Sequence, residues 1–139
     1  MGGGRGRRSE HQAVQALHLP YFGIGFKSYV WGKEALKLAE VAREVSLAAD
    51  IPIYVTPQLV DIAPIAREVG LPVLAPCIDP LRPGRGQGQV LPEAVREAGA
   101  VGAVINHMER RLSLADTYAA IRRAQEVGLI SLVCADTPE

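Results

Sequence analysis

Two polar side chains, a lysine and a histidine, stand directly after short apolar runs of the sequence, where they could act on a bound molecule. Lys27 follows the run 21–26, and His107 follows the run 101–106. Such a lysine can hold a phosphate or a polarised oxygen, and such a histidine can act as an electrophile or an acid–base group. Glu109 could pair with Lys27 and fix its direction. The same positions also suit a lysine that extends into solvent, a core histidine with satisfied hydrogen bonds and an ordinary surface ion pair.

Three further features have weaker chemical implications. The glycine-rich loop Gly84–Gly88 could cradle an anion with its backbone N–H groups, although a flexible turn or a subunit contact fits equally well. It is not a Walker loop, because no Gly-Lys-Ser or Gly-Lys-Thr closes it. Cys77 beside Asp79 permits thiol chemistry, but a small buried hydrophobic residue is the better default. Neither Cys77 nor Cys134 belongs to a CxxC pair, which argues against a metal site.

The elements that must position these residues follow from the hydrophobic pattern. Apolar runs of strand length alternate with longer amphipathic stretches, which predicts strand–helix units. The predicted strands are 21–26, 51–56, 71–75, 101–106 and 129–134, and the predicted helices are 33–49, 60–69, 92–98 and 114–127. One helical face is expected from Leu38, Val41, Ala42 and Val45, and another from Leu114, Tyr118, Ile121 and Ala124. Ser113 is expected as an N-cap, and Gly70, Gly99 and Gly128 as left-handed C-caps.

Repeated strand–helix units predict an α/β fold with a parallel sheet, right-handed crossovers and ligands at the carboxyl ends of the strands. Similar helix endings recur along the chain, as AREV at 42–45 and 66–69 and as AQEVG at 124–128. Two architectures use such units. One is a flavodoxin-like doubly wound sandwich, which the length of 139 residues favours, and the other is part of an eight-stranded barrel, which typically needs about 250 residues.

Composition excludes several classes of protein. The chain has 15 basic and 15 acidic residues, which gives no global field for nucleic acid or an anionic membrane. Aromatic residues make up only 5% of the chain, which argues against base-stacking surfaces, and no apolar run is long enough to span a membrane. Residues 1–19 are expected to form a tail and lead-in, rich in Gly and Arg at its start, before a single domain over 20–139.

Several segments, taken together and in this order, resemble the triosephosphate isomerase family, and most closely its archaeal-type branch with related bacterial sugar-phosphate isomerase-like proteins. The segments are GFKSY (25–29), TPQLVDI (56–62), IDPLRPG (78–84), LPEAVREAGAVG (91–102), NHMERR (106–111) and EVGLISLVCAD (126–136). The resemblance implies a (β/α)8 barrel, of which residues 20–139 would supply βα units one to four and strand five. This partial barrel then displaces the sandwich as the expected fold.

The resemblance also implies an activity. The family interconverts dihydroxyacetone phosphate and glyceraldehyde 3-phosphate through an enediolate, in glycolysis and gluconeogenesis, without a cofactor or metal. By this resemblance Lys27 would stabilise substrate charge, His107 would act as the neutral electrophile, and Glu109 would be the glutamate of the same motif; the neutral histidine is an established feature of the family. A small phosphorylated sugar is the expected ligand. The two cysteines fit a reducing compartment, so a cytoplasmic location is expected, and the unpaired edges of a partial barrel predict a homo-oligomer, with no specific nucleic-acid or membrane partner.

Four departures from the family pattern qualify this expectation. Gly25, a predicted substrate-binding position, stands where the family has an asparagine, and Met108 stands where it has a serine. The third loop carries Gln87-Gly88 in place of a Thr-Gly pair. No residue of this chain matches the family's catalytic glutamate, which comes later in the family's sequence. A fragment or degenerate homologue that binds without catalysis is therefore the alternative expectation.

Overall fold

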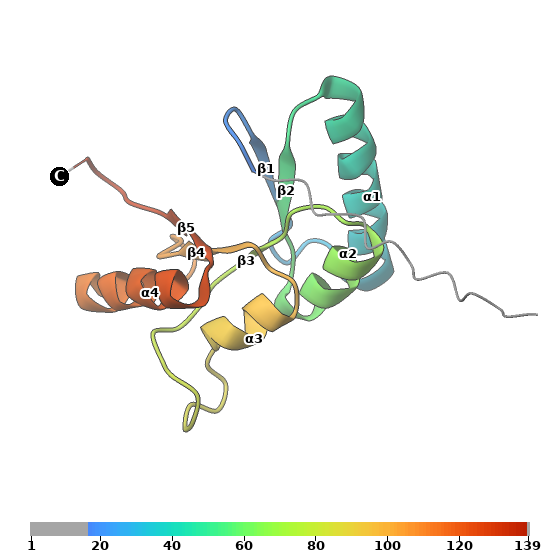
Figure 1. The fold of residues 1–139 in the computed structure, drawn as a ribbon. Helices are drawn as coiled ribbons and strands as arrows, with labels where there is room; N and C mark the ends of the chain where they lie inside the picture. The colour runs from blue at the N-terminus through green and yellow to red at the C-terminus, as the bar shows by residue number, and fades with distance from the viewer. Residues whose placement is uncertain (1–16, 139) are drawn as a thin grey trace, which may run out of the picture.

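The computed structural model describes residues 17–138, in which strands and helices alternate along the chain (Figure 1). The strands are β1 (Phe22–Gly25), β2 (Ile53–Thr56), β3 (Leu74–Ala75), β4 (Gly102–Ile105) and β5 (Ile130–Val133). The helices are α1 (Gly32–Ala49), α2 (Ile62–Glu68), which a short 3-10 turn η1 (Leu59–Asp61) precedes, α3 (Pro92–Glu97) and α4 (Leu114–Val127). The predicted alternation of strands and helices is thus confirmed. The expected tail lies outside the described residues except for 17–19, and the domain boundary at residue 20 stays a prediction.

All strand pairs are parallel, and their spatial order follows the order of the chain. β1 pairs with β2, and β3, β4 and β5 pair in sequence. A parallel bridge between Val55 and Val73 links the two groups of strands. The helices α1 to α4 all lie on one side of the strands (Figure 1). A flavodoxin-like sandwich instead has the strand order 2-1-3-4-5 and helices on both faces, so this alternative is wrong. The arrangement is that of consecutive βα units in an arc of a barrel.

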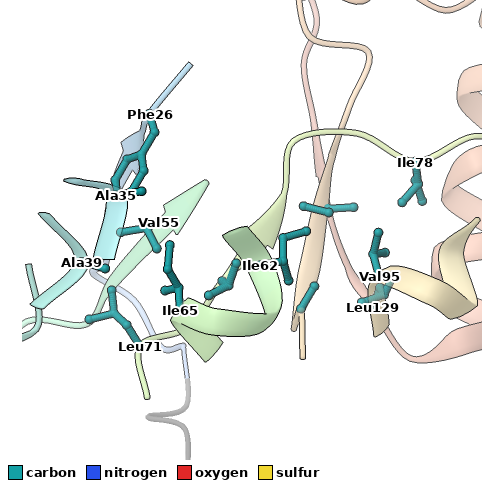
Figure 2. Close-up of a cluster of buried hydrophobic side chains, with 14 of the residues drawn as sticks. Phe26, Ala35, Ala39, Val55, Ile62, Ile65, Leu71, Ile78, Val95 and Leu129 are labelled. Atoms are coloured by element: carbon teal, nitrogen blue, oxygen red, sulfur yellow. The ribbon is translucent and has the colours of Figure 1, made fainter. Parts of the chain in front are cut away.

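The hydrophobic core lies between the strands and the helices (Figure 2). The β2 residues Ile53 and Val55 are buried toward it, while Tyr54 and Thr56, at the alternate positions, are half-buried and line a cleft. Successive residues of a strand point to opposite faces, so this alternation separates a helix-facing side from a cleft-facing side. The cleft-facing side therefore presents side chains that the core does not use.

The predicted helix faces are half right in both long helices: Ala42 and Ala124 are buried and Leu38 and Ile121 pack against the core, but the other predicted positions face away from it. α1 buries the small residues Ala35, Ala39, Ala42 and Ser46, while Val41 and Val45 are more than half exposed. α4 buries Thr117, Ala120, Arg123 and Ala124, while Leu114 and Tyr118 are largely exposed. Small side chains let a helix approach the sheet closely, so the alanine stripe faces the core and the neighbouring stripe of bulky residues does not.

The predicted N-cap Ser113 and C-cap Gly128 are confirmed, whereas Gly70 and Gly99 stand one residue after the C-caps Val69 and Ala98. The Ser113 hydroxyl accepts a hydrogen bond from the Asp116 backbone N–H at 3.0 Å, as an N-cap does. Gly70, Gly99 and Gly128 all have positive φ at the ends of helices. Because glycine adopts this conformation without a steric penalty, each of these residues lets the chain leave its helix and enter the next strand.

Candidate functional site

A cleft of about 640 Å³ opens at the carboxyl ends of the strands and brings the predicted site residues together. Lys27, His107, Glu109 and Gly25 all line it. Lys27 comes two residues after β1, and His107 comes two residues after β4. Because parallel strands end at the same edge, residues 80 positions apart in sequence meet here.

The lysine and the histidine are in direct contact. Lys27 Nζ lies 2.9 Å from His107 Nε2. Glu109 Oε2 lies 3.6 Å from Lys27 Nζ and 3.6 Å from His107 Nδ1. The Glu109 side chain is 65% exposed, so its ion pair with Lys27 adds little stability.

The hydrogen bond at Nδ1 favours one tautomer of His107. The backbone N–H of Glu109 donates to His107 Nδ1 at 3.1 Å, so Nδ1 is an acceptor and the proton of the neutral ring is on Nε2. A neutral ring has one acceptor nitrogen, so the contacts at Nδ1 and Nε2 are not both hydrogen bonds; with Nδ1 as the acceptor, Nε2–H and the Lys27 ammonium are two donors 2.9 Å apart. An acceptor oxygen placed against both would satisfy them, so the pair is complementary to an anionic or polarised oxygen.

The backbone of Lys27 is held in an unfavourable conformation. Its φ is +52°, a left-handed conformation that costs a residue with a Cβ roughly 1–2 kcal/mol. Gln58, from the loop after β2, compensates by donating from Nε2 to the Lys27 carbonyl oxygen at 3.2 Å and to Ser28 Oγ at 3.0 Å. Strain of this kind persists where the surrounding structure enforces it, and it is concentrated at functional sites.

Asn106 closes the loop that carries His107 and Glu109. Its φ is +60°, a conformation that asparagine tolerates better than most residues. Its amide Nδ2 donates to the Cys134 carbonyl oxygen at 3.1 Å, and its Oδ1 accepts from the Leu112 N–H at 2.9 Å. One side chain therefore ties the end of β4 both to the end of β5 and to the far end of the loop.

Asp79 and Arg110 connect a second loop to the site, a role that the sequence did not reveal. Asp79 is buried, and both its carboxylate oxygens lie 2.9 Å from Arg110 Nη2. Asp79 Oδ2 also accepts from the Val90 N–H at 2.7 Å. Cys77 lines the same cleft, and burial raises the pKa of its thiol, which keeps it protonated. For Asp79 and Arg110, the only signal in the sequence was that each follows a predicted strand.

The long loop between β3 and α3 is fastened at its outer part by a buried arginine. Arg123 Nε donates to the Leu81 carbonyl oxygen at 2.9 Å, Nη1 donates to Glu126 Oε2 at 2.6 Å, and Nη2 donates to Glu93. The hydrogen bond from Arg123 lowers the pKa of Glu93.

The glycine-rich segment 84–88 lines a separate hollow of about 560 Å³, which shares no residue with the cleft of Lys27 and His107.

Neither a metal centre nor a membrane span is found in the part of the chain that the structure describes. Within residues 17–138, no group of three or more His, Cys, Asp or Glu side chains is arranged to hold a metal ion. None of the described helices is both long and apolar enough to cross a membrane.

Comparison with known proteins gives a consistent result. The family model described as triosephosphate isomerase matches residues 20–139. The triosephosphate isomerase of Methanobacterium bryantii is 45% identical over 122 residues, which cover 86% of this chain and 54% of that protein. That of Methanosarcina barkeri is 39% identical over 120 residues, which cover 85% of this chain and 54% of that protein. The chain thus spans about half the length of the curated relatives it matches.

The fold has a counterpart among solved structures. The crystal structure of triosephosphate isomerase from Bartonella henselae superimposes with a TM-score of 0.70 at 21% sequence identity, over 83% of this chain and 49% of that chain. At this level of identity the likeness concerns the fold, and it confirms the partial (β/α)8 barrel expected from the resemblance.

Proposed function

The chain belongs to the triosephosphate isomerase family, and we propose that its cleft binds a small phosphorylated sugar between Lys27 and His107. The observation that carries this proposal is the 2.9 Å approach of Lys27 Nζ to His107 Nε2. Two donors directed at one point favour a ligand that brings an electron-rich oxygen to that point. The carbonyl or enediolate oxygen of a sugar phosphate has this character.

The reaction that fits the family and the cleft is the interconversion of dihydroxyacetone phosphate and glyceraldehyde 3-phosphate, or of a related aldose and ketose phosphate. In this proposal the Lys27 ammonium stabilises negative charge on the substrate. The neutral His107 ring donates from Nε2 to the oxygens of the enediolate as charge develops there. Glu109 directs the ammonium of Lys27. No cofactor or metal takes part, and the place of the reaction is glycolysis or gluconeogenesis in the cytoplasm.

A second candidate function is binding without turnover by the polypeptide of these 139 residues alone. Among the described residues, Glu109 is the carboxylate that lines the cleft, and it lies beside Lys27. The carboxylate that removes the carbon-bound proton in the family has no match in this chain, and a general base is typically worth 10²–10⁴ in rate. Gly25, in place of the family's asparagine, removes a further polar group from the site.

One experiment separates the two candidate functions. The purified chain is titrated with 2-phosphoglycolate, whose planar carboxylate stands in for the enediolate, and then incubated with dihydroxyacetone phosphate in deuterated water. Binding that Lys27→Ala weakens, with no deuterium incorporation, is the expected result for binding alone. Isomerisation that His107→Ala abolishes would establish catalysis by this chain. Absence of binding would contradict both candidate functions.

Homo-oligomerisation is proposed as well. Within residues 17–138, β1 and β5 each have one edge without a strand partner, and Phe22 and Ile130 on these strands are at least half exposed. Unpaired edges and exposed apolar side chains favour association. Sedimentation is expected to show a dimer or larger species, and a monomer that binds no hydrophobic dye would contradict this.

A further inference from the structure

The floor of the cleft contains a tyrosine that the proposed function does not use. Tyr54 of β2 is paired in register with Gly23 of β1. A Cβ built on Gly23 would lie 2.2 Å from Tyr54 Cζ and 2.3 Å from its hydroxyl oxygen. The tyrosine ring therefore occupies the space above Gly23, and it fits there because residue 23 has no side chain. The ring of Tyr21 packs edge-on against it, with the ring centroids 5.7 Å apart.

The next cleft-facing position along β1 is empty. A Cβ built on Gly25 would meet a single neighbour within 4 Å, Lys27 Nζ at 3.9 Å. Gly25 and Gly23 lie on the same face of β1, about 6.6 Å apart along the strand. An open space thus lies beside Lys27, two residues further along β1 than the position that the Tyr54 ring covers.

The Tyr54 hydroxyl is available to a ligand. It belongs to a half-buried side chain that lines the cleft, and it forms no hydrogen bond with any residue in the range 17–138. Burial, with smaller contributions from Tyr21 and Cys134, raises the pKa of Tyr54, so the hydroxyl keeps its proton and remains a donor. A half-buried hydroxyl without a protein partner gains from a ligand that supplies one.

The distribution of charge orients a ligand in this space. The charged side chains that line the cleft, Lys27, Glu109 and Arg110, all follow the strands at the mouth, whereas the uncharged Tyr54, Val104 and Leu132 line the deeper part. A phosphate group belongs at the mouth, where Lys27 and Arg110 can donate to it, because an anion without a partner is costly among uncharged side chains. Any extension of the sugar beyond its reacting carbons would then point down, toward Tyr54.

From these observations we infer that the cleft accepts a ketose or aldose phosphate longer than a triose, and that Tyr54 hydrogen-bonds an additional hydroxymethyl group beyond the reacting carbons. The inference rests on the proposed function, since it places the reacting oxygens between Lys27 and His107. Because Gly25 has no side chain, the additional hydroxymethyl group has space beside Lys27, and the Tyr54 hydroxyl forms its hydrogen bond. This makes Tyr54 a specificity-determining residue.

Two ligands that differ by a single hydroxymethyl group test the inference. The dissociation constants of dihydroxyacetone phosphate and of erythrulose 1-phosphate, in both enantiomers, are measured on the full chain by calorimetry. One enantiomer of erythrulose 1-phosphate is expected to bind about 2- to 10-fold more tightly, as one additional neutral hydrogen bond supplies. Tyr54→Phe keeps the ring against Tyr21 and is expected to bring the ratio of the two constants to about one.

A second variant acts through space rather than through the hydroxyl. Gly25→Asn fills the open position at an ordinary φ and is expected to abolish the preference for the longer ligand. If dihydroxyacetone phosphate binds in a Lys27-dependent manner but neither variant changes the ratio, the inference is wrong and the proposed function stands. If neither ketose phosphate binds the unmodified chain, both are wrong.

Discussion

Replacement of Asn106 tests how the loop of His107 is held. The side chain of Asn106 makes two hydrogen bonds, to the Cys134 carbonyl oxygen and from the Leu112 N–H, at 3.1 and 2.9 Å. Each such bond contributes about 1 kcal/mol net, so their loss costs about 2 kcal/mol. Alanine at φ +60° adds about 1 kcal/mol of backbone strain, which gives a total of about 3 kcal/mol for Asn106→Ala.

Two control variants separate the contributions to this total. Asn106→Gly removes the hydrogen bonds but tolerates positive φ, and is expected to cost about 2 kcal/mol. Asp50→Ala introduces alanine at another left-handed position, φ +54°, where the exposed side chain makes no hydrogen bond within residues 17–138. It is expected to cost about 1 kcal/mol.

Urea denaturation followed by circular dichroism measures the free energy of unfolding of all three variants. The expected order of destabilisation is Asn106→Ala, then Asn106→Gly, then Asp50→Ala. If Asn106→Ala costs no more than Asp50→Ala, the two hydrogen bonds do not stabilise the fold. If Asn106→Ala and Asn106→Gly cost the same, the left-handed backbone at residue 106 carries no strain.

Three further predictions follow from packing and from the shifted pKa values. Gly23→Ala should lower the free energy of unfolding by about 1–3 kcal/mol in urea denaturation, because its Cβ would overlap the ring of Tyr54. Gly25→Ala, whose Cβ would enter open space, should be nearly neutral. Equal effects of the two variants would contradict this prediction. The hydrogen bond from Arg123 lowers the pKa of Glu93, so the ionised Glu93 stabilises the folded state fully above the ordinary pKa of 4.5, and this contribution is lost as the pH falls below it. The urea midpoint of Glu93→Gln should therefore change less between neutral and acid pH than that of the unmodified chain. The same pH dependence in both proteins would contradict this. Burial raises the pKa of the Cys77 thiol, so little reactive thiolate is present at pH 8. Mass spectrometry should therefore show slow alkylation of Cys77 by iodoacetamide in the folded chain and fast alkylation in urea. Equal rates in the two conditions would contradict the burial of the thiol.

The sequence predicts the alternation of elements well because each element has a local signature. Buried parallel strands are continuous apolar runs, and glycine or serine marks the helix ends at Gly128 and Ser113. The meeting of Lys27 and His107 is predictable for a related reason, since both follow strands whose carboxyl ends share one edge.

The features that the sequence did not predict depend on tertiary packing. The core-facing stripe of α1 consists of alanines, and hydrophobicity alone favours the bulkier stripe of Val41 and Val45 beside it. Arg123 is buried on α4 because Glu93, Glu126 and the Leu81 carbonyl surround it, although an arginine on a helix normally indicates a solvent-exposed face. Two of these partners, Leu81 and Glu93, come from distant parts of the chain.

The role of Tyr54 also lay beyond the sequence. A tyrosine in a strand is typical of a half-buried surface, and nothing in its local pattern shows that its ring covers Gly23. Likewise, the left-handed conformations of Lys27 and Asn106 come from the loops they enter and have no signature in hydrophobic periodicity.

The most direct test of the proposed site is a crystal structure of the chain with 2-phosphoglycolate. The account predicts a carboxylate oxygen of the ligand within hydrogen-bond distance of both Lys27 Nζ and His107 Nε2, which lie 2.9 Å apart in the free chain. A ligand bound at the glycine-rich segment 84–88, with Lys27 and His107 still in contact with each other, would contradict it.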